Sequence, residues 1–444
     1  MVALQAVEFY EPMKLLITLA AIATSLYSAI AQEPAQQRMV LLISLDGFPA
    51  FALDDPKLPI PTLRHIMETG VSARMTTVNP TITWPNHTSM VTGVRPDQHG
   101  VLANGTISRT KGWPPFKADE TVDKEKMVHA LTIYDAAYQA GLTTAEVNWV
   151  AINRAHTITW AFSEWASPEG ALEREMIRKG VIAGSDVENF ASANILFRDQ
   201  IWTTAAVHLI REHKPNLLLF HLLSLDSVNH EYGPRSLAAL SAFAFLDACV
   251  ARLIEAVHAA SMGEHTTILI VSDHGFKRYS KQIRPAVALA KAGLAEAAYV
   301  LSEGGSAYVY FDPLRAGELT EKVKRALEGV EGIDQIIGPD GFAMLGLPQP
   351  GQDSQMGQLL LTCKDGYSFS GGTGGLVTAV PQSAGSHGYL ATDSDMDAIF
   401  IASGYGVRVG GRLEKIANID VAPTIAKLLG VTLPAPAGWP IPLE

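Results

Sequence analysis

Seven residues between positions 46 and 387 have side chains that bind divalent metals or act as nucleophiles. Asp carboxylates and His imidazoles are typical zinc ligands, and the set contains no thiolate. The pattern therefore indicates an open, hydrolytic metal site rather than a structural cysteine cluster. The residues are Asp46 in LISLDGF, Thr83 in TITWPNHTSMVTG, Asp226 and His230 in LLSLDSVNH, Asp273 and His274 in VSDHGF, and His387 in GSHGY.

The charges of these residues predict two cations. Asp46, Asp226 and Asp273 carry three negative charges, and a deprotonated Thr83 adds a fourth, which balances two Zn²⁺. Without cations the clustered carboxylates would repel one another strongly. Coordination to a divalent cation lowers the pKa of a hydroxyl enough to generate an alkoxide. We therefore expect Thr83 to be the nucleophile of a two-zinc site.

Each motif alone also has an ordinary structural interpretation. A single D-H-G or D-x-x-x-H is more often a turn aspartate or a capped helix, and TITWPNH also fits a strand end followed by a helix N-cap. Thr81 and Thr88 are close enough to be confused with Thr83. Pro85 and the residues after it predict a helix that places Thr83 near an N-terminus, where backbone N–H groups favour phosphate oxygens. The motifs indicate a metal site only when they are taken together.

Alternating apolar runs and amphipathic segments predict the elements that position these residues. Nearly continuous apolar runs are typical of parallel strands covered on both faces. Strand–helix–strand order implies a doubly wound α/β/α sandwich with a mostly parallel central sheet. The predicted strands are 39–45, 216–225, 266–272 and 398–402, and the predicted helices are 61–70, 195–213, 236–260 and 419–430.

The metal-type residues follow the predicted strands. Asp46, Asp226 and Asp273 each come after an apolar run, and ligands collect at the carboxyl ends of strands in such sheets. His230 converges with Asp226 if the chain between them makes one helical turn. His274 reaches the same site as Asp273 through the turn that contains Gly275.

Composition limits the class of substrate. The chain has 444 residues and is 48% hydrophobic, so it can bury a large core, and length alone suggests two or three domains. Its formal net charge is −11, and a basic footprint for a nucleic acid polymer is missing. A small or neutral substrate fits better, and positive charge for an anionic ligand would have to be supplied locally, for example by bound cations.

The N-terminus predicts export to the periplasm or the medium. Met13-Lys14 precedes an apolar run that ends in the small-residue triplet 29–31, so residues 1–31 are interpreted as a signal peptide cleaved after Ala31. An uncleaved anchor is the alternative. Residues 1–12 suit neither interpretation and indicate a mis-assigned start, and no stable membrane span is expected after cleavage.

Two cysteines are too few for a disulfide framework. Cys249 lies in an apolar stretch and is expected to be a buried small hydrophobe. A bridge between Cys249 and Cys363 is left open, as is the oligomeric state.

From about residue 38 to 432 the chain resembles the nucleotide pyrophosphatase/phosphodiesterase branch of the alkaline phosphatase superfamily. The resemblance is carried by LDGF at Asp46, TWPNH at 83–87, V-T-G-x-x-P-x-x-H-G-V at 91–101, and the Asp226, Asp273 and His387 motifs. It implies an alkaline phosphatase-like catalytic domain over 38–440, with inserted cap and pocket segments at about 105–195 and 277–385.

The resemblance also implies roles for single residues. One zinc would be bound by Asp226, His230 and His387, and the second by Asp46, Asp273, His274 and Thr83. The amide of Asn104 would hold a non-bridging phosphate oxygen, although an Asn-Gly turn is its ordinary structural interpretation. The implied activity is hydrolysis of small phosphate diesters, nucleotide-like or with a lipid head group, through a phosphothreonine intermediate.

The chain differs from the family at residues that are expected to form the substrate pocket. Trp84 stands where the family usually has Phe, so the shape of the pocket is expected to differ. Five residues of the first insertion are pocket candidates, and an Arg that contacts phosphate would favour monoesters. For each of them, ordinary core packing is the competing interpretation. The five are Trp149, Asn153, Arg154, Trp160 and Trp165.

Other functions remain as alternatives. A phosphomonoesterase of the alkaline phosphatase type or a phosphonate hydrolase would use the same metal site. A sulfatase would need Cys or Ser as the nucleophile in a C/S-x-P-x-R motif, which TWPNH lacks, and phosphoglycerate mutase chemistry would need Ser at position 83. A secreted binding protein would have lost at least one ligand, and none is missing.

Overall fold

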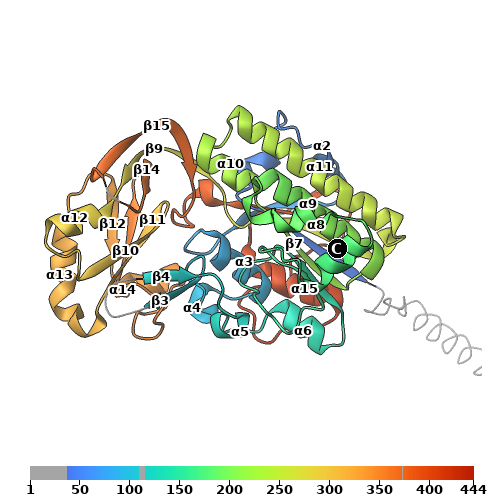
Figure 1. Cartoon of the computed structure of the whole chain (residues 1–444), viewed down its shortest axis with the longest axis horizontal. Coiled ribbons are helices and arrows are strands. Elements are labelled where there is room, and N and C mark those ends of the chain that lie inside the picture. Colours follow the sequence, from blue (N-terminus) through green and yellow to red (C-terminus); the bar gives the residue numbers. More distant parts are fainter. Residues whose placement is uncertain (1–37, 110–115, 373) are drawn as a thin grey trace, which may run out of the picture.

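A mixed sheet forms the centre of the larger lobe in the computed structural model, which describes residues 38–109, 116–372 and 374–444 (Figure 1). The predicted signal peptide and the start at Met13 lie outside the described residues. Within the described part, nine strands pair in the order β17-β2-β16-β8-β1-β7-β5-β6, with β18 beside β2. Their bounds are β1 Met39–Leu45, β2 Val71–Thr76, β5 Thr144–Val147, β6 Trp160–Phe162, β7 Leu217–Leu222, β8 Thr266–Val271, β16 Ala398–Gly404, β17 Gly411–Arg412 and β18 Ile416–Ala417.

Most neighbouring strands of this sheet are parallel, as predicted. β1 runs parallel to β7 and β8, and β5 runs parallel to β7 and β6. β16 is the exception, because it is antiparallel to both β8 and β2. The apolar run 398–402 was therefore correctly predicted as a strand, but not as a parallel one. The chain returns to the sheet beside the end of β8, where the Gly275 N–H donates to the Met396 carbonyl at 3.1 Å, and so it must run back along β8.

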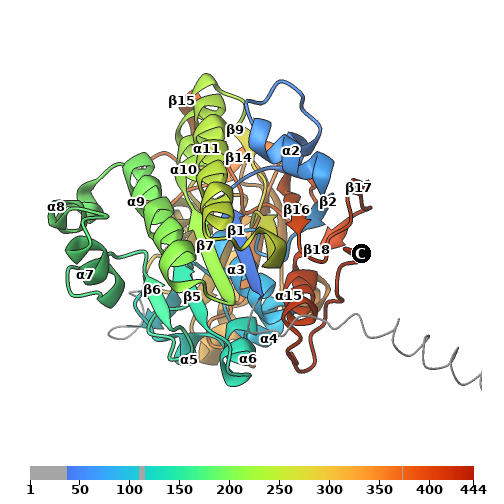
Figure 2. The ribbon, with the colours of Figure 1, turned by 90° about the vertical axis from the view of Figure 1, so that its right-hand side faces the viewer.

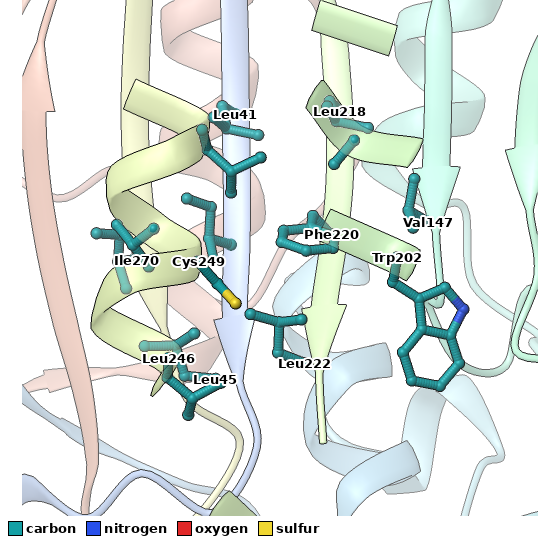
Figure 3. Close-up of a cluster of buried hydrophobic side chains, with 14 of the residues drawn as sticks. Leu41, Leu45, Val147, Trp202, Leu218, Phe220, Leu222, Leu246, Cys249 and Ile270 are labelled. Atoms are coloured by element: carbon teal, nitrogen blue, oxygen red, sulfur yellow. The ribbon is translucent and has the colours of Figure 1, made fainter. Parts of the chain in front are cut away.

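Apolar side chains cover both faces of the sheet, which explains the continuous apolar runs. In β1, Leu41, Ile43 and Leu45 pack into one core, and Val40 and Leu42 pack into another on the opposite face. Figure 3 shows part of the first core, including Leu41, Leu45, Phe220 and Cys249. The first core is covered by α2 Pro61–Thr69, α9 Ile195–His208 and α11 Leu237–Ala259, and the second by α3 Thr83–Thr92, α6 Ile133–Gln139 and α15 Val421–Leu429.

The long helix α11 is both a core element and apolar enough to span a membrane. By length and composition it is the one such candidate among the residues that the structure describes. Its side chains Phe243, Leu246 and Val250 are buried, and it lies beside α9 (Figure 2). The sequence analysis, which expected no stable membrane span after cleavage, did not single out this helix as long and apolar enough to span. Burial against α9 explains why α11 is so apolar.

The smaller lobe is built between the ends of β8 and β16 (Figure 1). A four-stranded sheet has the order β10-β11-β13-β12, and a three-stranded sheet has the order β14-β9-β15. Two helices, α12 Pro285–Lys291 and α13 Ala316–Leu327, pack on the four-stranded sheet. The strands are β9 Lys277–Ile283, β10 Ala298–Glu303, β11 Ser306–Phe311, β12 Ile333–Ile337, β13 Leu359–Cys363, β14 Gly366–Phe369 and β15 Val377–Ser386.

The segment 105–195 contributes to the central sheet as well as to the surface around it. Its strands β5 and β6 extend the sheet beyond β7. The rest comprises the hairpin of β3 Thr106–Arg109 and β4 Phe116–Asp119 and the helices α5 Lys124–Met127, α6, α7 Ala171–Arg178 and α8 Gly184–Glu188.

The two cysteines belong to different cores and do not pair. Cys249 is buried in the core under α11, as predicted, and Cys363 is buried in the smaller lobe. Both are free thiols.

Candidate metal centre

The ends of several elements meet at one edge of the central sheet and bring the predicted residues together. Asp46 follows β1 directly, and Asp273 and His274 follow β8. His387 follows β15 of the smaller lobe. Asp226 does not stand at a strand end as predicted, because β7 stops at Leu222 and the helix α10, Ser224–Tyr232, begins after it. Asp226 lies in the first turn of α10, and His230 lies one turn later, which is the predicted helical step.

One group of potential ligands consists of Asp226, His230 and His387. The Nε2 atoms of His230 and His387 are 3.1 Å apart. Asp226 Oδ1 lies 3.4 Å from Nε2 of His230 and 3.7 Å from Nε2 of His387. Bonds of about 2.0–2.2 Å to a tetrahedral zinc separate neighbouring ligand atoms by about 3.3–3.6 Å. The triangle therefore has the size of one face of a zinc site.

A second group lies beside the first and also includes Asp226. Ligand atoms of Asp46, Asp226 and His274 all lie within 4.8 Å of one another. His274 Nε2 is 3.5 Å from Asp46 Oδ1 and 3.2 Å from Asp273 Oδ2. The imidazole rings of His274 and His387 stack with centroids 3.7 Å apart. Asp226 thus lies between the two groups, whereas the sequence assigned it to only one.

Several atoms at the centre of this cluster are buried without a hydrogen-bond partner. Such atoms carry a free-energy penalty unless a cation or a donor satisfies them. All four belong to predicted ligands, so the donor set and its spacing fit divalent cations of the zinc type. The atoms are Asp46 Oδ1, Asp226 Oδ1, Asp273 Oδ2 and His274 Nε2.

Burial and charge repulsion favour the uncharged forms of Asp46, His274 and His387. Burial, together with the charges of Asp273 and Asp226, raises the pKa of Asp46 well above its usual value. Burial lowers the pKa of His274 to about 4 and that of His387 to about 3, so both imidazoles are neutral at pH 7. Neutral imidazoles are the form that binds metal, and cations would relieve the repulsion among the carboxylates.

Thr83 is itself the first residue of α3, whereas the sequence predicted a helix that begins after it. Thr83 is 9% exposed, whereas Asn86 and His87 in the same helix are fully buried. One turn later, the Nδ1 atom of His87 lies 2.9 Å from the Thr83 carbonyl oxygen and 3.7 Å from Asp273 Oδ2. His87 therefore connects the start of α3 to the second group of ligands.

Asn104 contacts the residue next to Thr83. Its Oδ1 accepts a hydrogen bond from the Trp84 N–H at 3.0 Å. This bond uses the acceptor end of the amide, so the donor end is the one that can meet a phosphate oxygen. The Asn-Gly pair does lie in a turn region, with Gly105 at a φ of 113°, but the side chain of Asn104 is directed to the start of α3.

Two positioning residues were not identified from the sequence. His221, inside β7, lies with Nε2 3.0 Å from Asp46 Oδ2 and Nδ1 3.0 Å from the Asn148 carbonyl oxygen. Asp199 on α9 accepts the N–H groups of Leu223 and Ser224 at the start of α10. A histidine within a continuous apolar run was the available signal for His221. Asp199 gave no comparable signal.

Gly47 allows Asp46 and Asp226 to approach each other. Its φ is 63°, which disfavours other residues, and a Cβ there would lie 2.7 Å from the Phe276 ring and 3.2 Å from the Asp226 Cα. The turn after β1 therefore needs glycine for both conformation and space.

A cavity of about 280 Å³ is lined by Trp84, the residue after Thr83, and by residues of the segment 105–195. Of the five pocket candidates, Trp149, Asn153, Arg154 and Trp165 line it. Trp160 does not, because its ring packs 4.7 Å from that of His213. Trp149 is 2% exposed and its ring centroid lies 4.8 Å from that of His87, so it also belongs to the core.

Charged residues of this cavity are mostly acidic. Arg154, the one cation among the described lining residues, forms an ion pair with Asp123 and donates to the Thr121 carbonyl at 2.9 Å. Three glutamates, Glu120, Glu146 and Glu164, also line this cavity. Burial, with the charge of Glu120, raises the pKa of Glu164 to about 7.

Known proteins are similar to this chain in sequence and fold. Residues 40–390 match the family described as type I phosphodiesterase/nucleotide pyrophosphatase. The chain is 23% identical over 429 residues to human ectonucleotide pyrophosphatase/phosphodiesterase family member 5, covering 94% of this chain and 80% of the human protein. It is 25% identical over 406 residues to rat family member 7, covering 89% of this chain and 84% of the rat protein.

Solved structures agree with the sequence comparison. Murine ectonucleotide pyrophosphatase/phosphodiesterase 5, solved as an inactive variant in complex with AMP, superposes with a TM-score of 0.70 at 20% identity. The match covers 90% of this chain and 97% of the murine chain. The predicted alkaline phosphatase-like fold is thereby confirmed. This chain therefore belongs to the type I phosphodiesterase/nucleotide pyrophosphatase family and is a hydrolase.

Proposed function

We propose that this protein is an exported phosphodiesterase/nucleotide pyrophosphatase with two zinc ions, which cleaves small phosphate diesters through a phosphothreonine intermediate. The observation that carries the proposal is the convergence of unpartnered buried carboxylate and imidazole atoms beside the helix that begins with Thr83. The proposed ligands are Asp226, His230 and His387 for one ion, and Asp46, Asp273, His274 and Thr83 for the other, with Asp226 close to both. When bound, the ions would supply positive charge that lowers the pKa of the Thr83 hydroxyl and stabilises negative charge on the phosphoryl group.

In the first step, Thr83 Oγ1 attacks phosphorus in line with the leaving oxygen. The P–Oγ1 bond forms while the bond to the leaving alcohol or phosphate breaks, and the leaving oxygen takes up a proton. Water then attacks phosphorus, the P–Oγ1 bond breaks, and Thr83 regains its proton. The donor end of the Asn104 amide is suited to hold a non-bridging oxygen in both steps, because its acceptor end is fixed by Trp84.

A diester preference is supported by the position of Arg154. A monoester dianion carries an extra charge that needs a donor. Arg154 is already paired with Asp123, and the other ionisable side chains that line the described part of this cavity are carboxyl groups, with no second cation. The proposed substituent for this cavity is therefore uncharged or cationic, or the flat base of a nucleotide beside Trp84 or Trp165. The AMP bound to the murine relative supports a nucleotide-like ligand.

Turnover of bis-p-nitrophenyl phosphate against p-nitrophenyl phosphate tests this proposal. We expect kcat/KM for the diester to exceed that for the monoester by about tenfold or more, on the order of 1.4 kcal/mol in transition-state binding. A strong monoester preference would instead support the alternative, a phosphomonoesterase. Preferential turnover of a phosphonate monoester would support a phosphonate hydrolase.

Export is proposed from residues 1–31. Mass spectrometry of the protein recovered from the periplasm or the medium is expected to find Gln32 at the N-terminus. An intact N-terminus in the membrane fraction would support the uncleaved anchor instead.

We also propose the division into one catalytic domain over 38–440 with pocket segments at about 105–195 and 277–385. The cavity lining from residues 120–165 supports the first of these segments.

A further inference from the structure

Two histidines and a glutamate converge on the outer helices, away from the catalytic residues. His208 Nε2 lies 2.8 Å from Glu175 Oε1, and His213 Nε2 lies 3.0 Å from the same oxygen and 3.2 Å from Oε2. His208 is buried, and Glu175 and His213 are partly buried, so the three side chains are held in place by their surroundings. Ligand atoms of the three residues all lie within 4.8 Å of one another.

The topology separates this cluster from the catalytic site. His213 ends the helical segment that precedes β7, so the cluster lies near the amino end of that strand. Asp226 and the other catalytic residues lie beyond the carboxyl ends of the strands. The cluster therefore lies at the opposite edge of the sheet and has no role in the proposed reaction.

An unusual backbone conformation brings the two histidines together. Residues Leu209–His213 form a π-helical turn, closed by a hydrogen bond from the Lys214 N–H to the Leu209 carbonyl at 2.9 Å. In an α-helix, side chains five residues apart point about 140° away from each other. The wider π turn places His208 and His213 on one side. Lys214 ends the turn with a φ of 46°, which a non-glycine residue rarely adopts.

We propose that Glu175, His208 and His213 form a peripheral binding site for a divalent cation of the zinc class. Two imidazoles and one carboxylate are the protein ligands of open zinc sites, and Ni²⁺ and Cu²⁺ accept the same set. Single-turn π segments often occur at functional sites. Here the π turn is needed to aim both Nε2 atoms at one carboxylate. A bound cation would fasten α7, which carries Glu175, to the end of α9.

Lys179 competes with the cation and sets the affinity of the site. Its Nζ atom lies 3.1 Å from Glu175 Oε1 and 2.8 Å from Glu212 Oε2. The Lys179 side chain is 44% exposed, so it can move away from Glu175 while it remains paired with Glu212. We therefore expect an exchangeable site rather than one that holds its metal permanently.

The test is a zinc titration of the EDTA-stripped full-length mature protein against a chromophoric chelator. Wild type is expected to bind one equivalent more than His213→Gln and Glu175→Gln, whose affinity at this site should fall by about tenfold or more. Lys179→Met should bind this equivalent more tightly than wild type. His65→Gln, which changes an exposed histidine on α2, is the matched control and should bind like wild type.

The glutamine variants separate a metal site from a hydrogen-bonded clamp. In His213→Gln, the glutamine can still donate a hydrogen bond to Glu175. If the three residues only form hydrogen bonds, this variant should therefore match wild type in both zinc stoichiometry and thermal stability. Diester turnover by the same variants serves as the check on folding, because none of these residues belongs to the proposed catalytic site. Equal stoichiometry in wild type and both variants, or no zinc anomalous signal between Glu175 and His213 in zinc-soaked crystals, would overturn the proposal.

Discussion

At the scale of single residues, the candidate site separates into a proposed nucleophile, ligand candidates and the side chains that hold them. Thr83 stands at the start of a fully buried helix, so its position is set by the packing of α3 and not by its own contacts. Asp46 is oriented by His221, which reaches it from the neighbouring strand. The proposed chemistry would therefore depend on positioning residues as well as on the ligand candidates.

Thr83→Ala is expected to reduce diester turnover by on the order of 10⁴-fold or more, because it removes the proposed nucleophile. Zinc should still bind with two equivalents at the catalytic site, since six protein ligands remain. Steady-state kinetics and metal analysis of the same preparation check both expectations. Thr83→Ser, which keeps a hydroxyl, should retain measurable turnover, and normal turnover by the alanine variant would refute the assignment.

His221→Ala should weaken zinc binding by about 10–100-fold, because an outer partner that orients a ligand is lost. Turnover should then recover as zinc is raised, whereas a residue that acts on the substrate itself would leave kcat low at saturating zinc. His221→Gln keeps a donor that can reach Asp46 and is expected to lie between wild type and the alanine variant. Zinc dependence of kcat measures the difference.

At the scale of elements, α10 decides where two of the ligand candidates lie. Its first free N–H groups are satisfied by a carboxylate from α9, at 3.0 Å from the Leu223 N–H and 2.9 Å from the Ser224 N–H. Burial raises the pKa of this group, Asp199, to about 6 from an ordinary value of 3.8. The start of α10, which carries Asp226, is thus stabilised by hydrogen bonds to the Asp199 carboxyl group. Burial of the charged form of this group costs free energy.

Asp199 should make stability fall as pH rises. Between about pH 4 and pH 6 the folded state keeps a proton on Asp199 that the unfolded state has released, so the free energy of unfolding decreases with pH. The slope reaches at most about 1.4 kcal/mol per pH unit from this one group. Urea denaturation of the metal-free protein at several pH values is expected to show a shallower decrease for Asp199→Asn. An equal slope in both proteins would exclude Asp199 as the source.

Removal of the Asp199 carboxylate should also destabilise the fold. Asp199→Ala leaves two buried N–H groups without acceptors, at about 1–3 kcal/mol each. Asp199→Asn keeps one acceptor oxygen and should lose less. The free energy of unfolding at pH 5 measures both, and zinc affinity of the alanine variant shows whether the start of α10 has moved.

At the scale of the whole molecule, the site joins two lobes. Asp46 and Asp273 come from the central sheet, whereas His387 follows β15 of the smaller lobe. His387 is anchored on the larger lobe by Nδ1, 3.0 Å from the Thr81 carbonyl oxygen, and the Gly388 N–H donates to the same oxygen. A cation held by ligands from both lobes would strengthen this junction.

Zinc is therefore expected to stabilise the whole fold. A ligand at about 100 times its Kd stabilises the native state by about 2.7 kcal/mol, so EDTA should lower Tm by several degrees and added zinc should restore it. His387→Ala should show a smaller zinc-dependent rise, because only the larger lobe then contributes ligands. Differential scanning calorimetry at several zinc concentrations provides the measurement, and an unchanged rise in His387→Ala would contradict the proposed bridge.

Local patterns in the sequence were sufficient to predict the strands β1, β7, β8 and β16 and the helices α2, α9, α11 and α15, and to propose the ligand candidates. β1 and β8 appear as apolar runs because both faces of the sheet are covered, and Asp46 and Asp273 follow them because loops at the carboxyl ends carry polar groups. These properties belong to short segments, so the types of their residues and the spacing of apolar residues are enough to predict them. The same short motifs were enough to indicate the family.

Tertiary structure alone decided the features that depend on how distant segments meet. The direction of β16 follows from the path of the smaller lobe, and the position of Asp226 between both ligand groups follows from the start of α10. Arg154 forms an ion pair with Asp123, whereas the sequence left open that it contacts phosphate. A π turn brought His208 and His213 to one glutamate. No local pattern encodes these outcomes, because each is set by packing and charge between segments far apart in the chain.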